Sequence, residues 1–316
     1  VIHAGIDYPE NSFKSRFCLE GNKMLYEYAD EKNISHSKVG KYIVASQAGE
    51  LNALEKLFQQ GIRNNVNLKY CSKEETEEAI PQIVCSSALF SPETGIIDVP
   101  EFITALEGDI QHENGIVSFN TEFISAKKSK NFFQISCNDG TNFSIQSKKL
   151  VNASGLSSDL ISYKIDQLDQ RYVFPINFAK GHYFKYSAPN PFSSLVYPLA
   201  DEFSLGIHVG FDLSGQLRFG PDLTWIDSID FSFDESLKEK FINSIHRYWP
   251  DMDPKKLHPD YVGIRPKIQN NNEGMQDFSI LGPEEHGIKG LINLQGIESP
   301  GVTSALAIGK HVSSLL

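Results

Sequence analysis

The sequence predicts an α/β protein in which one domain interrupts another. Three observations support this. Helix-like and strand-like patterns alternate up to about residue 111, a β-rich stretch covers 170–232, and a strand–loop–helix unit returns in 291–316. The chain has 316 residues, more than one compact domain usually holds. We therefore expect its first and last parts to form one domain around a second, inserted one.

Composition excludes several classes of protein. Hydrophobic residues make up 40% of the chain and charged residues 22%, which is ordinary for a folded globular protein and unlike a disordered or collagen-like one. The net charge of −11 argues against nucleic acid as a partner and against broad attraction to anionic membranes. An anionic substrate would therefore need a local cationic pocket.

The sequence shows neither a membrane-targeting pattern nor a cysteine motif. No apolar run approaches the ~20 residues of a membrane helix, and residues 1–16 lack the apolar segment of a signal peptide. The four cysteines are scattered, without a C-x-x-C or zinc-like spacing. We expect free thiols, no bound metal and a cytoplasmic location, with the mitochondrion or the periphery of an inner membrane as alternatives.

The N-terminal third is predicted to alternate helices and a strand. Apolar residues recur at helical spacing, and short apolar runs indicate strands. Asp98 starts a helix as its cap, with Glu101 as the reciprocal carboxylate. The expected elements are a helix over 13–29, a strand over 41–45, a helix over 51–62, a solvated acidic helix face over 72–78 and a helix over 98–111.

A three-stranded meander follows, and then a strand–turn–helix unit. Strand patterns cover 115–124, 131–137 and 142–148, and Asp139-Gly140 predicts a tight hairpin between the last two. Leu150 to Ala153 is a short strand before a small-residue turn and a helix. Such a turn presents backbone N–H groups to a phosphate or to a ring edge.

The remaining elements are mainly strands. The stretch 170–232 contains several strand patterns, including 203–213 around His208. Asp234 caps a helix that continues to about residue 248. A final strand over 291–296 leads through a tight loop to a helix that begins at Pro300-Gly301.

Motif searches exclude three classes of enzyme. No two glycines are spaced i, i+2, so G-x-G-x-x-G is missing, and the P-loop, H-E-x-x-H and G-x-S-x-G patterns are missing too. P-loop nucleotide hydrolysis, zinc proteolysis and serine hydrolysis therefore have no support.

The stretch 294–309 is the most informative. Small residues line the start of its helix, whose free N–H groups and positive dipole end favour an electron-rich group such as the N1–C2=O edge of a reduced flavin. Close packing of this helix on a sheet explains the small residues equally well.

Isolated polar residues are weaker candidates. Arg265 precedes Pro266, which favours extended backbone and lets the guanidinium reach a carboxylate, although a surface arginine is commoner. His208 lies in an apolar strand, where it is either a satisfied core residue or a base at a cleft. His182 and Tyr183 are neighbours, so only one can face a cleft. His3 beside Ala4 is, taken alone, part of a turn.

Taken together and in this order, these segments resemble the FAD-dependent D-amino-acid-oxidase-like superfamily, and more closely the L-2-hydroxyglutarate dehydrogenase/oxidase family. The matching stretches cover most of the chain, and their ordered set is specific. They are VIHAGIDYP, CLEGNKMLYEYA, SPETGIIDVPEF, KKLVNASGLSSD, LVYPLADEFSLGIHVGFDLSGQLRFGPD, VGIRPKI and INLQGIESPGVTSALAIG.

The resemblance implies a Rossmann-like FAD domain over 1–38, 96–165 and 289–316, and a β-rich α+β substrate domain over 39–95 and 166–288. It implies oxidation of a 2-hydroxy acid to a 2-oxo acid, with FAD taking the hydride and oxygen or a quinone as the possible final acceptor. It also implies three groups of cofactor-binding residues: His3, Ala4 and Gly5 by the isoalloxazine ring, Ala153, Ser154 and Gly155 on the adenosine side, and Gly296, Glu298, Ser299, Gly301, Val302 and Thr303 by the pyrimidine end.

One feature departs from the family. The family begins with a strand, G-x-G-x-x-G and a helix that hold the pyrophosphate, and this unit is missing between Val1 and Leu316. We therefore expect a glycine-rich segment upstream of Val1, an incomplete parallel sheet, and poor binding of FAD without that segment.

For the reaction, His208 is the first choice as the base that takes the hydroxyl proton, with His3 and His182 in reserve. Arg265 is expected to bind the 1-carboxylate, and Tyr183 and Tyr197 to donate hydrogen bonds. Lys267, two residues beyond Arg265, is the candidate for a second carboxylate.

Two alternatives stay open. One is a related flavoenzyme that acts on an amino acid or on glycerol 3-phosphate. The other is a truncated, non-catalytic binding module.

Overall fold

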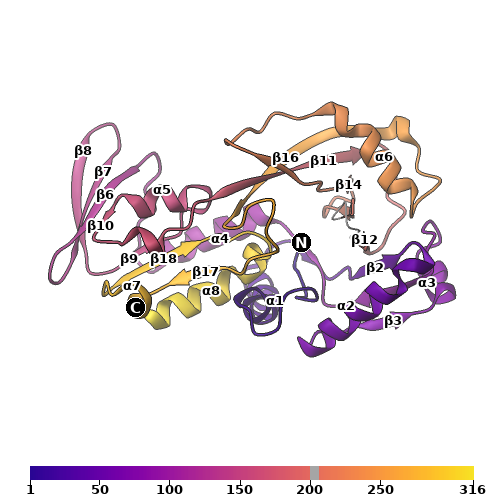
Figure 1. Ribbon diagram of the computed structural model, residues 1–316, viewed down its shortest axis with the longest axis horizontal. Helices are drawn as coiled ribbons and strands as arrows, with labels where there is room; N and C mark the ends of the chain where they lie inside the picture. The colour runs from indigo at the N-terminus through magenta and orange to yellow at the C-terminus, as the bar shows by residue number, and fades with distance from the viewer. Residues whose placement is uncertain (200–205) are drawn as a thin grey trace.

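The computed structural model describes residues 1–199 and 206–316. Figure 1 shows an elongated molecule: a small sheet and the meander occupy one end, and a large sheet with α6 (Lys238–His246) occupies the other. Of the described residues, no helix combines the length and the apolar character that a bilayer crossing requires. The four cysteines are buried free thiols, as predicted.

The small sheet joins chain segments that are far apart in sequence. β9 (Leu150–Asn152) runs parallel to β18 (Leu291–Gln295), and β17 (Ser279–Leu281) pairs antiparallel with β18. α8 (Gly301–Leu315) follows β18 directly and packs against α1 (Phe13–Lys32). A Cβ on Gly21 would lie 2.2 Å from the carbonyl oxygen of Thr303, so these two helices approach each other more closely than a side chain there would permit.

The meander is confirmed with one correction. β6 (Glu122–Lys128), β7 (Phe133–Asn138) and β8 (Asn142–Ser147) form it, with Gly140 at positive φ in the hairpin, and β10 (Ile165–Asp166) pairs with β6. The predicted strand over 115–124 was wrong for residues 115–121. Gly115 closes the preceding helix through a bond to the Ile110 carbonyl, and a Ser118–Thr121 hydroxyl bond makes a turn.

The large sheet combines strands from both sides of the meander. Its order is β15-β11-β14-β13-β12-β2-β4-β3, and β16 pairs with β11. The bounds are β2 (Lys41–Ala45), β3 (Lys69–Cys71), β4 (Ser87–Ser91), β11 (Asn177–Tyr186), β12 (Leu195–Pro198), β13 (Val209–Phe211), β14 (Leu217–Phe219), β15 (Thr224–Ile226) and β16 (Leu257–Lys267). The strand predicted over 203–213 lies partly outside the described residues, and of its described part only Val209–Phe211 form a strand, β13.

The helices agree with the sequence pattern, and one cap differs. α2 (Leu51–Arg63), α3 (Lys73–Ala79) and α4 (Val99–His112) form as predicted. Asp98 accepts the N–H of Glu101 at 2.9 Å, but the Glu101 carboxylate accepts the N–H of Ser35 at 2.7 Å instead of closing the reciprocal cap. This bond ties α4 to β1 (His36–Ser37), which pairs with β5 (Ile96–Ile97). The remaining short helices are α5 (Ser158–Tyr163) and α7 (Pro283–His286).

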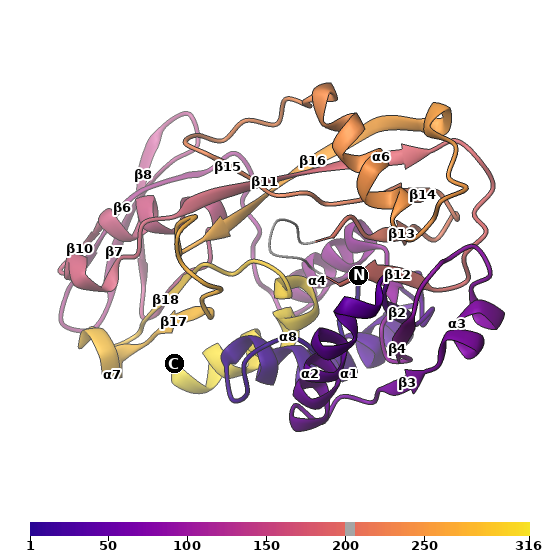
Figure 2. The same ribbon diagram turned by 45° about the vertical axis from the view of Figure 1, so that its right-hand side comes forward.

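The N-terminal segment lies where the two ends of the molecule meet. Figure 2 shows the N-terminus between α8 and β12. The N–H of His3 donates to the Thr303 hydroxyl at 3.0 Å, and Val1 lines a cavity together with Tyr197 of β12. This segment therefore connects the small sheet to the large one.

Candidate functional site

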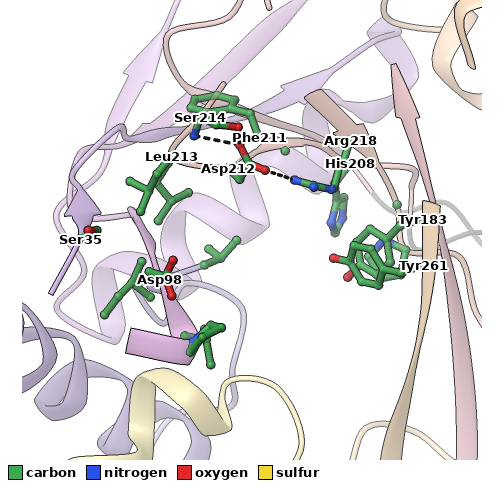
Figure 3. A pocket seen from close by; sticks show the side chains of 18 of the residues that line it. Ser35, Asp98, Tyr183, His208, Phe211, Asp212, Leu213, Ser214, Arg218 and Tyr261 are labelled. Carbon is green, nitrogen blue, oxygen red and sulfur yellow. Dashed lines mark hydrogen bonds and ion pairs between the residues drawn. The ribbon is translucent and has the colours of Figure 1, made fainter. Parts of the chain in front are cut away.

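A cavity of about 930 Å³ lies between the large sheet and the start of α4 (Figure 3). Most of its polar lining comes from the large sheet and the loops that follow its strands. These side chains are Tyr183, Tyr197, His208, Asp212, Ser214, Arg218 and Tyr261, with Ser35 and Asp98 on the opposite side.

Two aromatic stacks form one wall of the cavity. Tyr183 of β11 is the register partner of Tyr261 of β16, and their rings stack with centroids 4.4 Å apart. Tyr197 of β12 stacks on His208 with centroids 3.6 Å apart. Burial raises the pKa of Tyr183 and of Tyr197, so both hydroxyls stay protonated at neutral pH and can donate hydrogen bonds.

Arg265 lies on the same face of β16 as Tyr261. Its backbone is extended, as predicted, and its Nη2 donates to the carbonyl oxygen of Asp222 at 3.0 Å. Gly263 stands between these two residues, and a Cβ there would meet no atom within 4 Å. An open space thus lies over Gly263, with a guanidinium on one side and a phenol on the other.

His182 faces away from the cavity. Because side chains alternate along β11, Tyr183 lines the cavity while His182 is buried on the opposite face of the sheet. Its ring lies edge-on to Phe233, and its Nδ1 lies 3.0 Å from the Asp222 carboxylate. The structure therefore does not bring His182 to the other candidate residues.

Lys267 is held in a buried cluster apart from the cavity. Its Nζ lies 2.7 Å from Oε1 of Glu298, and Nζ of Lys14 lies 2.9 Å from the same oxygen. Lys267 is thus engaged at the loop before α8, and it is not among the residues that line the cavity. Glu298 fixes that loop to α1 and to β16.

His3 lies beside the start of α8. Its Nε2 is 3.5 Å from the Ser299 hydroxyl. Burial lowers the pKa of His3 well below 6.5, and the charges of Lys41, the N-terminus and His208 lower it further. The imidazole is therefore neutral at pH 7. Ala4 is buried behind it, and Gly5 has a φ of +85° next to Cys18.

The first turn of α8 has unpaired donors. The backbone N–H groups of Val302 and Thr303 have no acceptor among residues 1–199 and 206–316, and the Ser299 and Val302 side chains are exposed. Gly301 opens the helix, and Gly296 turns the chain with a φ of +65°. A donor-rich, positive helix end beside a neutral imidazole fits the electron-rich pyrimidine edge of a flavin.

The turn after β9 opens on the same edge of the small sheet. Asn152 of β9 is the register partner of Asn293 of β18, so Ala153 and Gly296 both follow the carboxyl ends of parallel strands. Ser154 donates from its N–H and its hydroxyl to Asn152 Oδ1, at 3.2 and 2.6 Å, and Gly155 has positive φ. Both turns therefore stand at the same edge of the small sheet.

Sequence reasoning missed three residues near the cavity, Lys41, Arg218 and Tyr261. Lys41 is 5% exposed, and its Nζ lies 4.6 Å from the centroid of the Tyr197 ring. Among the described residues, this ammonium has no ion pair and no hydrogen bond. Arg218 donates to Asp212 and Asp260 at 2.6 Å each. Lysine at an inward position of the KYIVA strand was the one available signal for Lys41.

The family comparisons agree with this geometry. The model of the family of FAD dependent oxidoreductases matches residues 1–315. The chain is 36% identical to the mitochondrial L-2-hydroxyglutarate dehydrogenase of Arabidopsis thaliana, over 99% of this chain and 74% of that protein. It is 24% identical to the L-2-hydroxyglutarate dehydrogenase of Escherichia coli K12, over 99% of this chain and 81% of that protein. It is 30% identical to a glycerol 3-phosphate dehydrogenase of Caloramator mitchellensis, over 100% of this chain and 64% of that protein.

Solved structures confirm the predicted fold class. L-alpha-glycerophosphate oxidase from Mycoplasma pneumoniae, solved with FAD bound, has a TM-score of 0.87 at 23% identity and covers 100% of this chain and 82% of its own. Glycine oxidase from Geobacillus kaustophilus has a TM-score of 0.80 at 16% identity, over 99% and 82% of the two chains. With a family match over nearly its whole length, the chain belongs to the FAD-dependent oxidoreductase family.

Proposed function

We propose that this protein oxidises a 2-hydroxy acid to the 2-oxo acid, with L-2-hydroxyglutarate as the substrate. FAD, when bound, supplies the hydride acceptor for the substrate C2–H. One observation carries the proposal: a guanidinium, three phenols and an imidazole border one cavity and the space over Gly263. The similarity to the plant enzyme of that name supports the choice of substrate.

Arg265 binds the 1-carboxylate in this proposal. Its Nη2 is engaged with the Asp222 carbonyl, and the remaining N–H groups of the guanidinium can bond a carboxylate placed over Gly263. Tyr183 and Tyr261 border the same face and donate hydroxyl bonds to the carboxylate or to the substrate hydroxyl. These bonds orient C2–H in one direction.

His208 takes the hydroxyl proton as the hydride leaves. It lines the cavity directly, and its stack on Tyr197 holds the imidazole plane. A neutral imidazole has one nitrogen that can accept a proton. The pKa of His3 is lowered by burial, but His3 lies beside Ser299, so we assign it to the ring end of the cofactor and retain it as the alternative base.

The chain's own residues would hold the flavin at two places. The N–H groups of Val302 and Thr303, with Ser299 and His3, would bond the pyrimidine end. The turn at Ala153, Ser154 and Gly155 would lie on the adenosine side, because it opens at the same edge of the small sheet.

Glycerol 3-phosphate is the second candidate substrate. A relative named for that activity is 30% identical over the whole chain, and the glycerophosphate oxidase has a TM-score of 0.87. Both substrates carry an alcohol carbon near an anionic group, so Arg265 can serve either. They differ in whether that group is a carboxylate or a phosphate.

The decisive experiment is anaerobic flavin reduction by a panel of substrates. The full-length protein, loaded with FAD, is mixed with L-2-hydroxyglutarate, its D enantiomer, glycerol 3-phosphate or glycine, and bleaching of the flavin absorbance is followed. We expect L-2-hydroxyglutarate to give the highest second-order rate constant. Faster bleaching by glycerol 3-phosphate would replace the proposed substrate with the second candidate.

The domain boundaries, the final acceptor and the compartment also stay proposals. We propose an FAD domain over 1–38, 96–165 and 289–316 and a substrate domain over 39–95 and 166–288. β17 belongs to the proposed substrate domain but pairs with β18 of the proposed FAD domain. Oxygen or a quinone accepts the electrons, which reoxidation kinetics with each would distinguish. The relatives include bacterial proteins and proteins named as mitochondrial, and both compartments fit the proposal.

A further inference from the structure

The turn Gly220–Asp222 contacts three candidate residues through its backbone. The Gly220 N–H donates to the carbonyl oxygen of His208 at 3.1 Å, and the Asp222 carbonyl oxygen accepts from Arg265 Nη2 at 3.0 Å. A Cβ on Gly220 would lie 2.9 Å from the ring of Tyr183. The position of this turn therefore sets where the guanidinium of Arg265 can lie.

A buried carboxylate anchors this turn from the far side of the sheet. Asp222 is 3% exposed, and its Oδ1 accepts the His182 N–H at 2.7 Å and lies 3.0 Å from His182 Nδ1. Lys240 of α6 adds an ion pair at 3.6 Å. His182 is as deeply buried, and its Nε2 has no hydrogen-bond partner in the described part of the chain. Burying this pair is costly, which favours a role beyond packing.

There is little room for the turn to move. A Cβ on Gly181 would lie 2.8 Å from Pro221 Cβ, 3.1 Å from the Asp222 carbonyl oxygen and 3.4 Å from Arg265 Nη2. Glycine at 181 therefore permits the close approach of the strand, the turn and the guanidinium. A methyl group added there would push the turn and Arg265 apart.

We infer that Asp222 is a positioning residue for substrate binding: its carboxylate, tied to His182, holds the carbonyl oxygen that orients Arg265. The inference rests on the proposed function, because it takes Arg265 as the group that binds the substrate carboxylate. His182 acts in the same chain of contacts from behind the sheet. It contributes through Asp222 and not by contact with the substrate.

The test compares Asp222→Ala and Asp222→Asn with the matched control Asp234→Asn. Asp234 caps the helical turn before α6, and asparagine caps a helix nearly as well. For Asp222→Ala we expect KM for L-2-hydroxyglutarate to rise by at least about fivefold with kcat changed less than about twofold, the pattern of lost uniform binding. The Asp222→Asn variant keeps one carboxamide oxygen as an acceptor, so its KM should fall between wild type and the alanine variant. A folded Asp222→Ala variant that shows a lowered kcat at unchanged KM overturns the inference.

A double-mutant cycle separates the inference from the proposed function. If Asp222 acts through Arg265, then Asp222→Ala adds little to the loss already caused by Arg265→Ala. Additive losses contradict the inference and leave the function standing. If Arg265→Ala alone leaves kcat/KM unchanged, the proposed role of Arg265 in binding the substrate carboxylate is wrong.

Should Asp222→Ala not fold, Gly181→Ala supplies the same test, because its methyl group separates the turn from Arg265 without removing the carboxylate. A raised KM supports the inference, and an unchanged KM contradicts it.

Discussion

His208 lies flat on Tyr197, with ring centroids 3.6 Å apart and planes inclined by 8°. The stack covers one face of the imidazole and leaves the ring at the cavity wall. Lys41 places its ammonium 4.6 Å from the centroid of the same phenol ring. An imidazole, a phenol and a buried ammonium are thus in one contiguous group, brought together from β2, β12 and the residue before β13.

Replacing His208 by asparagine should slow the reaction without unfolding the protein. Loss of a positioned general base typically costs about 10²–10⁴-fold in rate. Steady-state kinetics with L-2-hydroxyglutarate would measure this, and His3→Asn is the parallel variant. If His3→Asn shows the larger drop in kcat and His208→Asn shows almost none, the two roles must be exchanged.

Arg265→Ala should lower kcat/KM by at least about tenfold, because a charge-assisted hydrogen bond contributes ~1.5–3 kcal/mol. Arg265→Lys keeps the charge but loses the planar fork, so it should recover only part of the loss. A loss below tenfold in the alanine variant would show that another group binds the carboxylate.

Lys41→Met should raise the pKa of His3. Burial is the largest cause of its low pKa, and the charge of Lys41 is the next. A histidine whose folded pKa is lowered loses stability as pH falls below the unfolded value of about 6.5, because the unfolded chain then binds more protons. The variant should therefore lose less stability between pH 7 and pH 5 than wild type. Imidazole NMR titration reports the pKa directly, and an unshifted His3 resonance would contradict this electrostatic role.

Gly21→Ala should destabilise the junction of α1 and α8. The added methyl group would lie 2.2 Å from the Thr303 carbonyl oxygen, so the backbone of α1 or of α8 would have to shift. Overpacking of this kind typically costs about 1–3 kcal/mol. Thermal unfolding should show a lower Tm, with weaker retention of FAD because Thr303 belongs to the first turn of α8. Gly309→Ala is the control, since its Cβ would meet no atom within 4 Å.

Local patterns predicted the elements better than the contacts between them. Alternation along β11 indicated that only one of His182 and Tyr183 faces the cavity, and the loop before α8 was placed correctly. The strand expected over 115–124 begins only at Glu122, because helix-closing and turn bonds outweigh strand propensity over 115–121.

Contacts between distant segments could not be predicted from a single sequence. Lys267 shares Glu298 with Lys14, a residue that α1 brings close only after the whole chain has folded. Strand periodicity alone placed Lys267 beside Arg265 and gave no indication of that ion pair. The same limit hid Tyr261, which becomes a cavity residue through its register with Tyr183.

The most direct measurement is the rate at which L-2-hydroxyglutarate bleaches the FAD of the full-length protein without oxygen, compared with the same substrate deuterated at C2. We expect complete bleaching, slower for the deuterated substrate, since the C2–H bond breaks as the hydride leaves. A flavin that keeps its absorbance with this substrate, or bleaching of the wild type at the same rate as the Arg265→Ala variant, would contradict this expectation.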